Sequence, residues 1–250
     1  MALCKIEILT FAVLVFYIPI AQCWGIDGHL IVCKLAQVLT FLNFTFYTFH
    51  QPRLSKAAED AVSQLLPSYA DNDLGSLCSW ADRVKFRYHW SSPLHFINSP
   101  DDLCNYQYNS EHEIPAPFVI IRKRFLKYNL TEALLFLSHF MGDIHQVWDS
   151  SIIETAEETF YNSEVDELIS ALDKNISTVW SNQAKAWGAC SKTSCPDVYA
   201  SEGIKAACEW AYKGVEEDSV LGGRHIHTLV NLRLAQGGVR LAATLNRIFG

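Results

Sequence analysis

The stretch Leu137-Ser138-His139-Phe140-Met141-Gly142-Asp143-Ile144-His145 decides how this sequence is interpreted. Apolar residues just before it predict a helix over 131–139. On a helix His139 and Asp143 are four positions apart and share one face. A neutral imidazole and a carboxylate are both zinc ligands, so this face predicts a metal site. One such pair is more often a surface hydrogen bond, so the prediction needs further ligands.

Apolar residues at helical spacing recur along the rest of the chain, and no strand ladder, repeat or heptad array accompanies them. The sequence therefore predicts a single, mainly helical all-α domain over 24–250. Gly237-Gly238 falls inside the last predicted helix, where it indicates close packing or a kink. The other predicted helices cover 28–37, 55–66, 152–176 with a break near Asn162-Ser163, 201–215 and 229–249. Two stretches do not fit this pattern, namely 38–51 and 114–125.

Composition excludes two broad classes of protein. Half of the 250 residues are hydrophobic, which excludes general disorder. Twenty basic against 27 acidic residues give a net charge of -7, which argues against a basic nucleic-acid-binding module. An enzyme acting on nucleic acid remains open, because a bound metal can supply the local positive charge.

The N-terminus is typical of an export signal. An apolar run over 8–21 is followed by Ala21 and Cys23, which are spaced as a cleavage site before Trp24. We expect a signal peptide over 1–23. A membrane anchor is the weaker alternative, because the run is shorter than the roughly 20 residues of a membrane-spanning helix. Stable membrane association is not expected, and the predicted location is the secretory pathway, with an extracellular or vacuolar destination.

Six cysteines remain after this cleavage, and an even number in an exported chain indicates disulfides. Six cysteines allow 15 connectivities. Cys190 and Cys195 bracket a short loop, so we expect them to pair with each other. Glycosylation sequons occur at Asn43, Asn129 and Asn175.

Further candidate metal ligands lie outside the central stretch. His95 stands in the apolar context Leu94-His95-Phe96-Ile97, where an unpaired imidazole is costly to bury. Asp149 lies four residues after His145 and forms a second pair with it. If cleavage exposes Trp24, its amine and carbonyl can chelate a metal near His29. Asp82 completes the candidate set.

These residues carry a resemblance to a known family. Trp24 followed by Gly25-Ile26-Asp27-Gly28-His29 resembles the S1/P1 (type I) nuclease family, the secreted zinc-dependent nucleases of plants and fungi. The stretches 94–97, 136–149 and 236–242 are similar to its plant branch of bifunctional endonucleases. The resemblance implies a helical phospholipase C/nuclease fold with three zinc ions in a cleft. It also implies a monomer that hydrolyses single-stranded DNA and RNA to 5'-phosphate products and acts on 3'-nucleotides.

The resemblance assigns roles to individual residues. The first zinc is bound by Asp82, His95, His139 and Asp143. The second zinc is bound by Trp24, His29 and the shared Asp143. Asp149 matches the aspartate of the third zinc. Asp82 orients the attacking water, Lys85 occupies the place of a transition-state arginine, Phe96 stacks on a base, and Asn98 replaces a base-binding aspartate. The implied disulfides are Cys33–Cys78, Cys104–Cys208 and Cys190–Cys195.

The chain departs from the family pattern in three places. A loop with a Pro-x-His ligand is missing between Gln146 and Val147, where His145 could stand in as a ligand of the third zinc. Residues 38–51 look inserted, and the region after Tyr108 looks shortened, with a cysteine pair missing. This pattern suggests a splicing or gene-model variant of a nuclease. A catalytically impaired zinc or nucleotide binder and a zinc phospholipase C therefore remain as alternatives.

Overall fold

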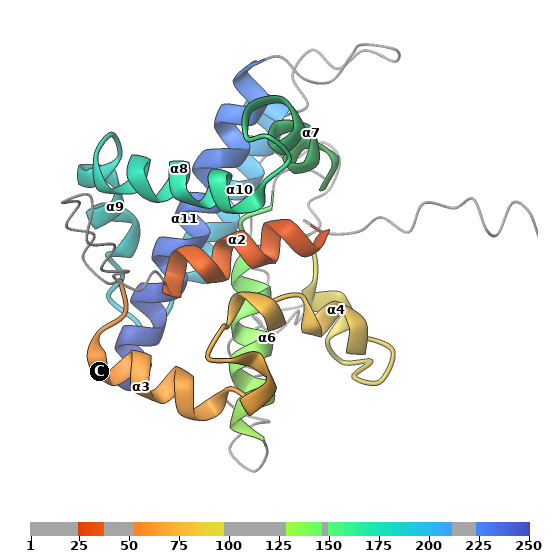
Figure 1. Cartoon of the computed structure of the whole chain (residues 1–250), viewed down its shortest axis with the longest axis vertical. Helices are drawn as coiled ribbons and strands as arrows, with labels where there is room; N and C mark the ends of the chain where they lie inside the picture. The colour runs from red at the N-terminus through yellow and green to blue at the C-terminus, as the bar shows by residue number, and fades with distance from the viewer. Residues whose placement is uncertain (1–24, 38–52, 98–128, 147–149, 212–223) are drawn as a thin grey trace, which may run out of the picture.

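The computed structural model describes residues 25–37, 53–97, 129–146, 150–211 and 224–250 (Figure 1). No strand occurs among these residues, which confirms the all-α prediction. None of the helices in this part of the chain combines the length and hydropathy that crossing a bilayer requires. The predicted insertion over 38–51 and the stretch 114–125 lie outside the described residues.

The centre of the fold is the long helix α11, Arg224–Phe249, against which α2, Gly25–Gln37, makes its most extensive contacts (Figure 1). The two glycines in α11 explain this approach, because a Cβ on Gly238 would lie 2.5 Å from Leu35 Cβ. A Cβ on Gly237 would lie 3.1 Å from a methyl group of Val32. The glycines therefore serve close packing, and α11 continues through them as one helix.

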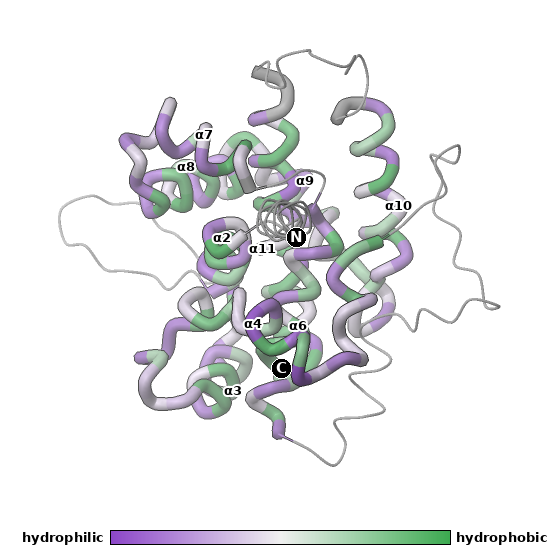
Figure 2. The backbone as a smooth tube through the Cα atoms, turned by 90° about the vertical axis from the view of Figure 1, so that its right-hand side faces the viewer, coloured by the Kyte–Doolittle hydropathy of each residue, from purple (hydrophilic) through white to green (hydrophobic). Residues whose placement is uncertain are grey.

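The remaining helices surround this pair, and hydrophobic and hydrophilic residues alternate along most of them (Figure 2). Such amphipathic helices bury one face in a shared core. The helices are α3 Lys56–Leu65, α4 Trp80–Val84, α6 Leu130–Asp143, α7 Ser150–Phe160, α8 Val165–Ser177, α9 Ser181–Gly188 and α10 Pro196–Ala206. Short 3₁₀ turns cover Ser68–Ala70, Gly75–Leu77 and Ser92–Leu94, and a π-helical turn covers Ala207–Ala211.

Most helix predictions are confirmed, with four corrections: α10 and α11 each begin five residues before the predicted start, and α4 and α9 were not predicted. The break near Asn162 and Ser163 is present, since both residues have positive φ angles of 52° and 61°. Helix α10 begins at Pro196, five residues before the predicted start, because proline is well suited to the first helical turn. Helix α9 was not predicted, although Trp180, Ala184 and Trp187, at helical spacing, pack against the core without being fully buried.

Two disulfides link described residues. Cys190–Cys195 and Cys33–Cys78 form as expected, and the latter joins α2 to the segment just before α4. Cys208 is also disulfide-bonded, whereas Cys104, its expected partner, lies outside the described residues.

Candidate metal centre

Five side chains from separate parts of the chain meet at one place. Helix α2 contributes His29, α4 contributes Asp82, and His95 follows the turn Ser92–Leu94. Helix α6 contributes His139 and Asp143 near its end, where it is buried without interruption from Leu134 onward. The three histidines and Asp143 are almost fully buried, whereas the Asp82 side chain is 27% exposed.

Asp143 lies between the three imidazoles. Its Oδ1 is 3.4 Å from His29 Nε2, and its Oδ2 is 3.3 Å from His95 Nδ1 and 3.2 Å from His139 Nε2. The two carboxylate oxygens therefore face different histidines. This is the arrangement that a carboxylate shared by two metal ions requires.

Asp82 approaches the same centre from the side that is open to solvent. Its Oδ1 lies 3.4 Å from His95 Nδ1 and 3.7 Å from His139 Nε2, and the two ring nitrogens are 2.9 Å apart. Two sets of three ligand atoms result, namely His29, His139 and Asp143, and Asp82, His95 and His139. Two ligands about 2.1 Å from a tetrahedral zinc lie roughly 3.4 Å apart, so the observed spacings suit such an ion.

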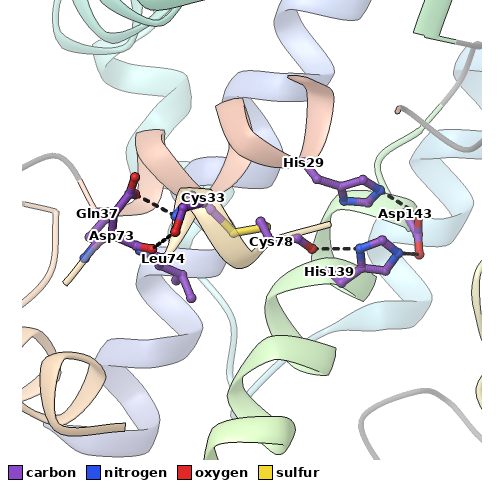
Figure 3. The surroundings of a disulfide bond; sticks show 10 residues. His29, Cys33, Gln37, Asp73, Leu74, Cys78, His139 and Asp143 are labelled. Carbon is purple, nitrogen blue, oxygen red and sulfur yellow. Dashed lines mark hydrogen bonds and ion pairs between the residues drawn. A yellow bond between two sulfur atoms is a disulfide. The ribbon is translucent and has the colours of Figure 1, made fainter. Parts of the chain in front are cut away.

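Neighbouring groups fix the orientation of these ligands. His139 Nδ1 donates a hydrogen bond of 2.8 Å to the Cys78 carbonyl, so its Nε2 faces the centre (Figure 3). Metal-binding histidines are commonly oriented in this way. The disulfide from Cys78 leads to Cys33, which is one helical turn from His29 on α2. The disulfide therefore ties helix α2, which carries His29, to the residue whose carbonyl orients His139.

Glycine is required where α2 and α6 meet. A Cβ on Gly142 would lie 2.6 Å from His29 Nδ1 and 3.0 Å from its Cε1. The neighbouring Asp143 could not meet His29 in its observed position if residue 142 had a side chain. Sequence reasoning missed Gly142, although a glycine inside a strongly predicted helix is a signal of close approach.

The pKa shifts of Asp143 and His29 favour a bound cation, whereas the raised pKa of His139 opposes one. Burial, together with the charge of His139, lowers the pKa of His29. Burial alone would raise the pKa of Asp143, but the charge of His139 and the contacts with the imidazoles hold it well below its usual range. Burial likewise opposes the charged form of His139, yet Asp143 and Asp82 raise its pKa. An ionised Asp143 beside a neutral His29 is the state that metal binding needs.

Several buried polar atoms at the centre form close charged contacts but no aligned hydrogen bond. Neither ring nitrogen of His29 and neither carboxylate oxygen of Asp143 forms an aligned hydrogen bond within the described residues. Leaving such groups without hydrogen bonds costs free energy, and a bound cation would satisfy them. Imidazole and carboxylate together are the donor set that zinc prefers. The residues present therefore fit a zinc ion.

His145 is held away from the role that the sequence suggested. Its Nδ1 donates to the Met141 carbonyl at 2.7 Å, and its Nε2 accepts from Arg240 Nη1 at 2.9 Å. Burial and the charges of Arg233 and Arg240 hold the pKa of His145 well below its usual range. Both ring nitrogens are engaged, so neither is available to a third zinc in this structure. Sequence reasoning missed Arg240, whose signal is a charge within an apolar helical stretch.

The other predicted site residues have different outcomes. Lys85 Nζ lies 3.8 Å from Asp82 Oδ1, and Phe96, which follows His95, is 53% exposed. Trp24, Asn98 and Asp149 lie outside the described residues, as does Asn43. Asn129 is exposed at the start of α6, where its side chain accepts a hydrogen bond from the Thr131 N–H. Asn175 is half-buried in α8.

Comparison with known proteins identifies relatives along the whole of this structure. The model of the S1/P1 nuclease family matches residues 24–146 and 145–250. The match begins at Trp24, and its two parts meet where the sequence lacks the expected loop. The alignment with Endonuclease 2 of Arabidopsis thaliana extends over 288 residues and is 46% identical, covering 95% of this chain and 94% of the relative.

Two further relatives set the range of similarity. The alignment with Endonuclease 4 of Arabidopsis thaliana is 37% identical and covers 92% of this chain and 90% of the relative. Nuclease P1 of Penicillium citrinum is 28% identical over 49% of this chain and 46% of its own length. Together with the family match over almost the entire sequence, these similarities show that the chain belongs to the S1/P1 nuclease family.

Proposed function

We propose that this protein is a zinc-dependent endonuclease that hydrolyses single-stranded DNA and RNA to 5'-phosphate products and also acts on 3'-nucleotides. The observation that carries the proposal is the position of Asp143, buried between three imidazoles with both oxygens unsatisfied by aligned hydrogen bonds. The names of the similar proteins, endonucleases and a nuclease, support the choice of reaction. They also favour a nuclease over a phospholipase C.

Zinc would be held by the described ligands at the centre. Trp24 is the further proposed ligand of the second zinc, and Asp149 is the proposed ligand of a third zinc; both lie outside the described residues. Bound zinc ions would lower the pKa of a coordinated water and neutralise charge on a phosphoryl group. The ligands are His29, Asp82, His95, His139 and Asp143.

The residues at the open side of the centre would handle the substrate. Asp82 is partly exposed and can accept a hydrogen bond from the attacking water, which orients that water. The ammonium of Lys85, beside Asp82, would contact the negative phosphoryl oxygens as a point charge. Phe96 would stack on an unpaired base, and Asn98 would hydrogen-bond its edge.

The proposed setting is the secretory pathway, ending outside the cell or in the vacuole. Disulfides are characteristic of oxidising compartments, and this chain has them at Cys33–Cys78 and Cys190–Cys195. We propose removal of 1–23, glycosylation at the sequons, and a monomeric mature chain that begins at Trp24. N-terminal mass spectrometry of secreted protein tests this start, and any other first residue removes Trp24 from the ligand set.

Asp143→Asn tests the proposed function. The substitution keeps the shape of the side chain but removes its charge, so we expect loss of most bound zinc and at least a hundredfold drop in single-strand hydrolysis. The measurements are metal analysis, hydrolysis of a single-stranded oligonucleotide, and mass spectrometry of the 5' ends. Asp60→Asn is the control, since Asp60 is exposed on α3. A zinc-free wild-type protein, or full activity in Asp143→Asn, would contradict the proposal.

A catalytically impaired zinc or nucleotide binder is the second candidate. It is favoured by His145, whose ring nitrogens are both engaged by Met141 and Arg240. In that case the wild-type chain binds zinc at the described centre without hydrolysing single-stranded DNA. The same zinc and hydrolysis measurements separate the two candidates.

A further inference from the structure

The turn that follows Asp82 carries an outward surface made of Arg83, Phe86 and Arg87. Helix α4 ends at Val84, and the backbone N–H groups of Arg87 and Tyr88 both donate to the Val84 carbonyl, so one more turn of helical type follows. At helical spacing, positions 83, 86 and 87 share one face. Both arginines are exposed, and Phe86 is 71% exposed. This set of three residues is called the basic face below.

The opposite side of this turn is packed against α6. Ala81 is fully buried in a cluster with Phe136, against which Val84 and Tyr88 also pack. The rings of Tyr88 and Phe136 are 5.5 Å apart, in an edge-to-face arrangement. Figures 1 and 2 both show α4 beside α6. Because α6 also carries two ligands of the metal centre, this packing fixes the basic face relative to that centre.

The charge of the basic face contrasts with that of the whole protein. The chain has a net charge of -7, yet residues 83–90 contain three cationic side chains and no acidic one. Lys85 lies beside Asp82, but no ion pair joins Arg83 or Arg87 to another described residue. Exposed arginines without neutralising partners attract a polyanion. Phe86 lies between them and offers a flat apolar surface.

We propose that the basic face binds the single strand of nucleic acid that extends beyond the cleaved bond. Arg83 and Arg87 contact backbone phosphates, and Phe86 stacks on an unpaired base, as aromatic side chains do in single-strand binding proteins. This inference rests on the proposed function. It adds a group of residues that makes binding depend on the length of the nucleic-acid strand. A long strand reaches both the metal centre and the basic face, whereas a mononucleotide at the centre reaches only the centre.

The double variant Arg83→Gln/Arg87→Gln tests the phosphate contacts. The probe is a fluorescein-labelled 12-nucleotide oligo-dT with phosphorothioate linkages, which resist hydrolysis, and anisotropy gives its affinity across a range of salt concentrations. Each lost phosphate contact reduces the slope of log affinity against log salt by about 0.7 on a single strand. We therefore expect the slope to fall by about 1.4 and the affinity at low salt to weaken roughly tenfold.

Lys185→Gln/Lys192→Gln is the matched control for this variant. It removes the same charge from two exposed side chains in and after α9, on the opposite side of the molecule from α4 (Figure 1). The control should leave the salt slope unchanged. Equal slopes in the two double variants, or no change in either, would overturn the inference.

Phe86→Ala tests the stacking contact separately. Loss of one base stack should weaken binding of the 12-nucleotide single strand about tenfold, whereas Phe86→Trp should preserve it. Binding of a 12-base-pair duplex should be the same in all three proteins, because its bases are already stacked. An unchanged single-strand affinity, or an equal loss for the duplex, would overturn the stacking role.

A separate measurement distinguishes failure of this inference from failure of the proposed function. Wild-type protein and the arginine variant should hydrolyse a dinucleotide at equal rates, since a dinucleotide does not extend to the basic face. A wild-type protein that cleaves neither the dinucleotide nor single-stranded DNA contradicts the proposed function, while the binding measurements still decide this inference. Reduced dinucleotide cleavage in the variant would count against the basic face as a site for the extended strand.

Discussion

At the scale of the residue, the metal centre depends on the absence of a side chain at Gly142. A methyl group there would lie 2.6 Å from His29 Nδ1, and His29 is fully buried on a helix that packs closely against α11. We expect Gly142→Ala to displace the imidazole and to lower the zinc content of purified protein. Helix content should change little, since alanine favours helix over glycine by about 1 kcal/mol. Metal analysis and circular dichroism measure the two effects.

Gly188→Ala is the control for this substitution. A methyl group at Gly188 would lie 3.6 Å from Ala243 Cβ, which is an ordinary contact. This variant should keep the zinc content of the wild-type protein. A full zinc complement in Gly142→Ala would show that His29 contributes little to metal binding.

At the scale of the element, α7 carries a carboxyl group whose protonation is coupled to folding. Burial, then the charges of Asp27 and Glu154, raises the pKa of Glu157 from 4.5 to about 7. The folded protein therefore holds a proton that the unfolded chain releases between these two values. Its free energy of unfolding must fall as the pH rises through this window.

We expect Glu157→Gln to remove this dependence, because the amide keeps the shape of the protonated acid. The Tm of the variant should exceed that of the wild-type protein by about 2–6 °C at pH 8 and should match it near pH 4. Thermal unfolding of both proteins at the two pH values gives the Tm difference. Glu158→Gln, at an exposed position of the same helix, should shift Tm by less than this at pH 8. A Tm difference for Glu157→Gln that is the same at both pH values would contradict the coupling.

At the scale of the whole molecule, we expect the number of bound zinc ions to depend on the Pro-x-His loop that the family pattern places between Gln146 and Val147. A catalytic zinc normally has at least three protein ligands. His145 is held by Met141 and Arg240, so it adds no ring nitrogen to Asp149. We therefore expect this chain to retain about two zinc ions and to have strongly reduced nuclease activity.

Inserting a family-like Pro-x-His loop between Gln146 and Val147 should restore the third zinc and turnover together. A loop of equal length with alanine in place of its histidine should restore neither. Zinc content and single-stranded DNA hydrolysis, measured side by side on the three proteins, decide the point. Three zinc ions with full activity in the unmodified chain would refute this account.

The sequence by itself determined the helical class, the break at Asn162-Ser163, the pairing of Cys190 with Cys195, and the types of ligand at the centre. These features depend on local spacing along the chain, which periodicity and short motifs record. The resemblance added the pairing of Cys33 with Cys78 and the grouping of ligands. Even so, helix α9 was not predicted, because its apolar stripe is short and only partly buried.

Only the tertiary structure decided how the carboxylate of Asp143 is shared and what His145 does. Asp143 faces histidines from three separate segments, which meet because Gly142 and Gly238 let α2 approach α6 and α11 closely. His145 follows Asp143 by two residues, yet Arg240 from α11 occupies its Nε2. The packing of helices that are distant in sequence sets which groups bind the ring nitrogens of His145. The residues next to His145 along the chain therefore do not reveal these partners.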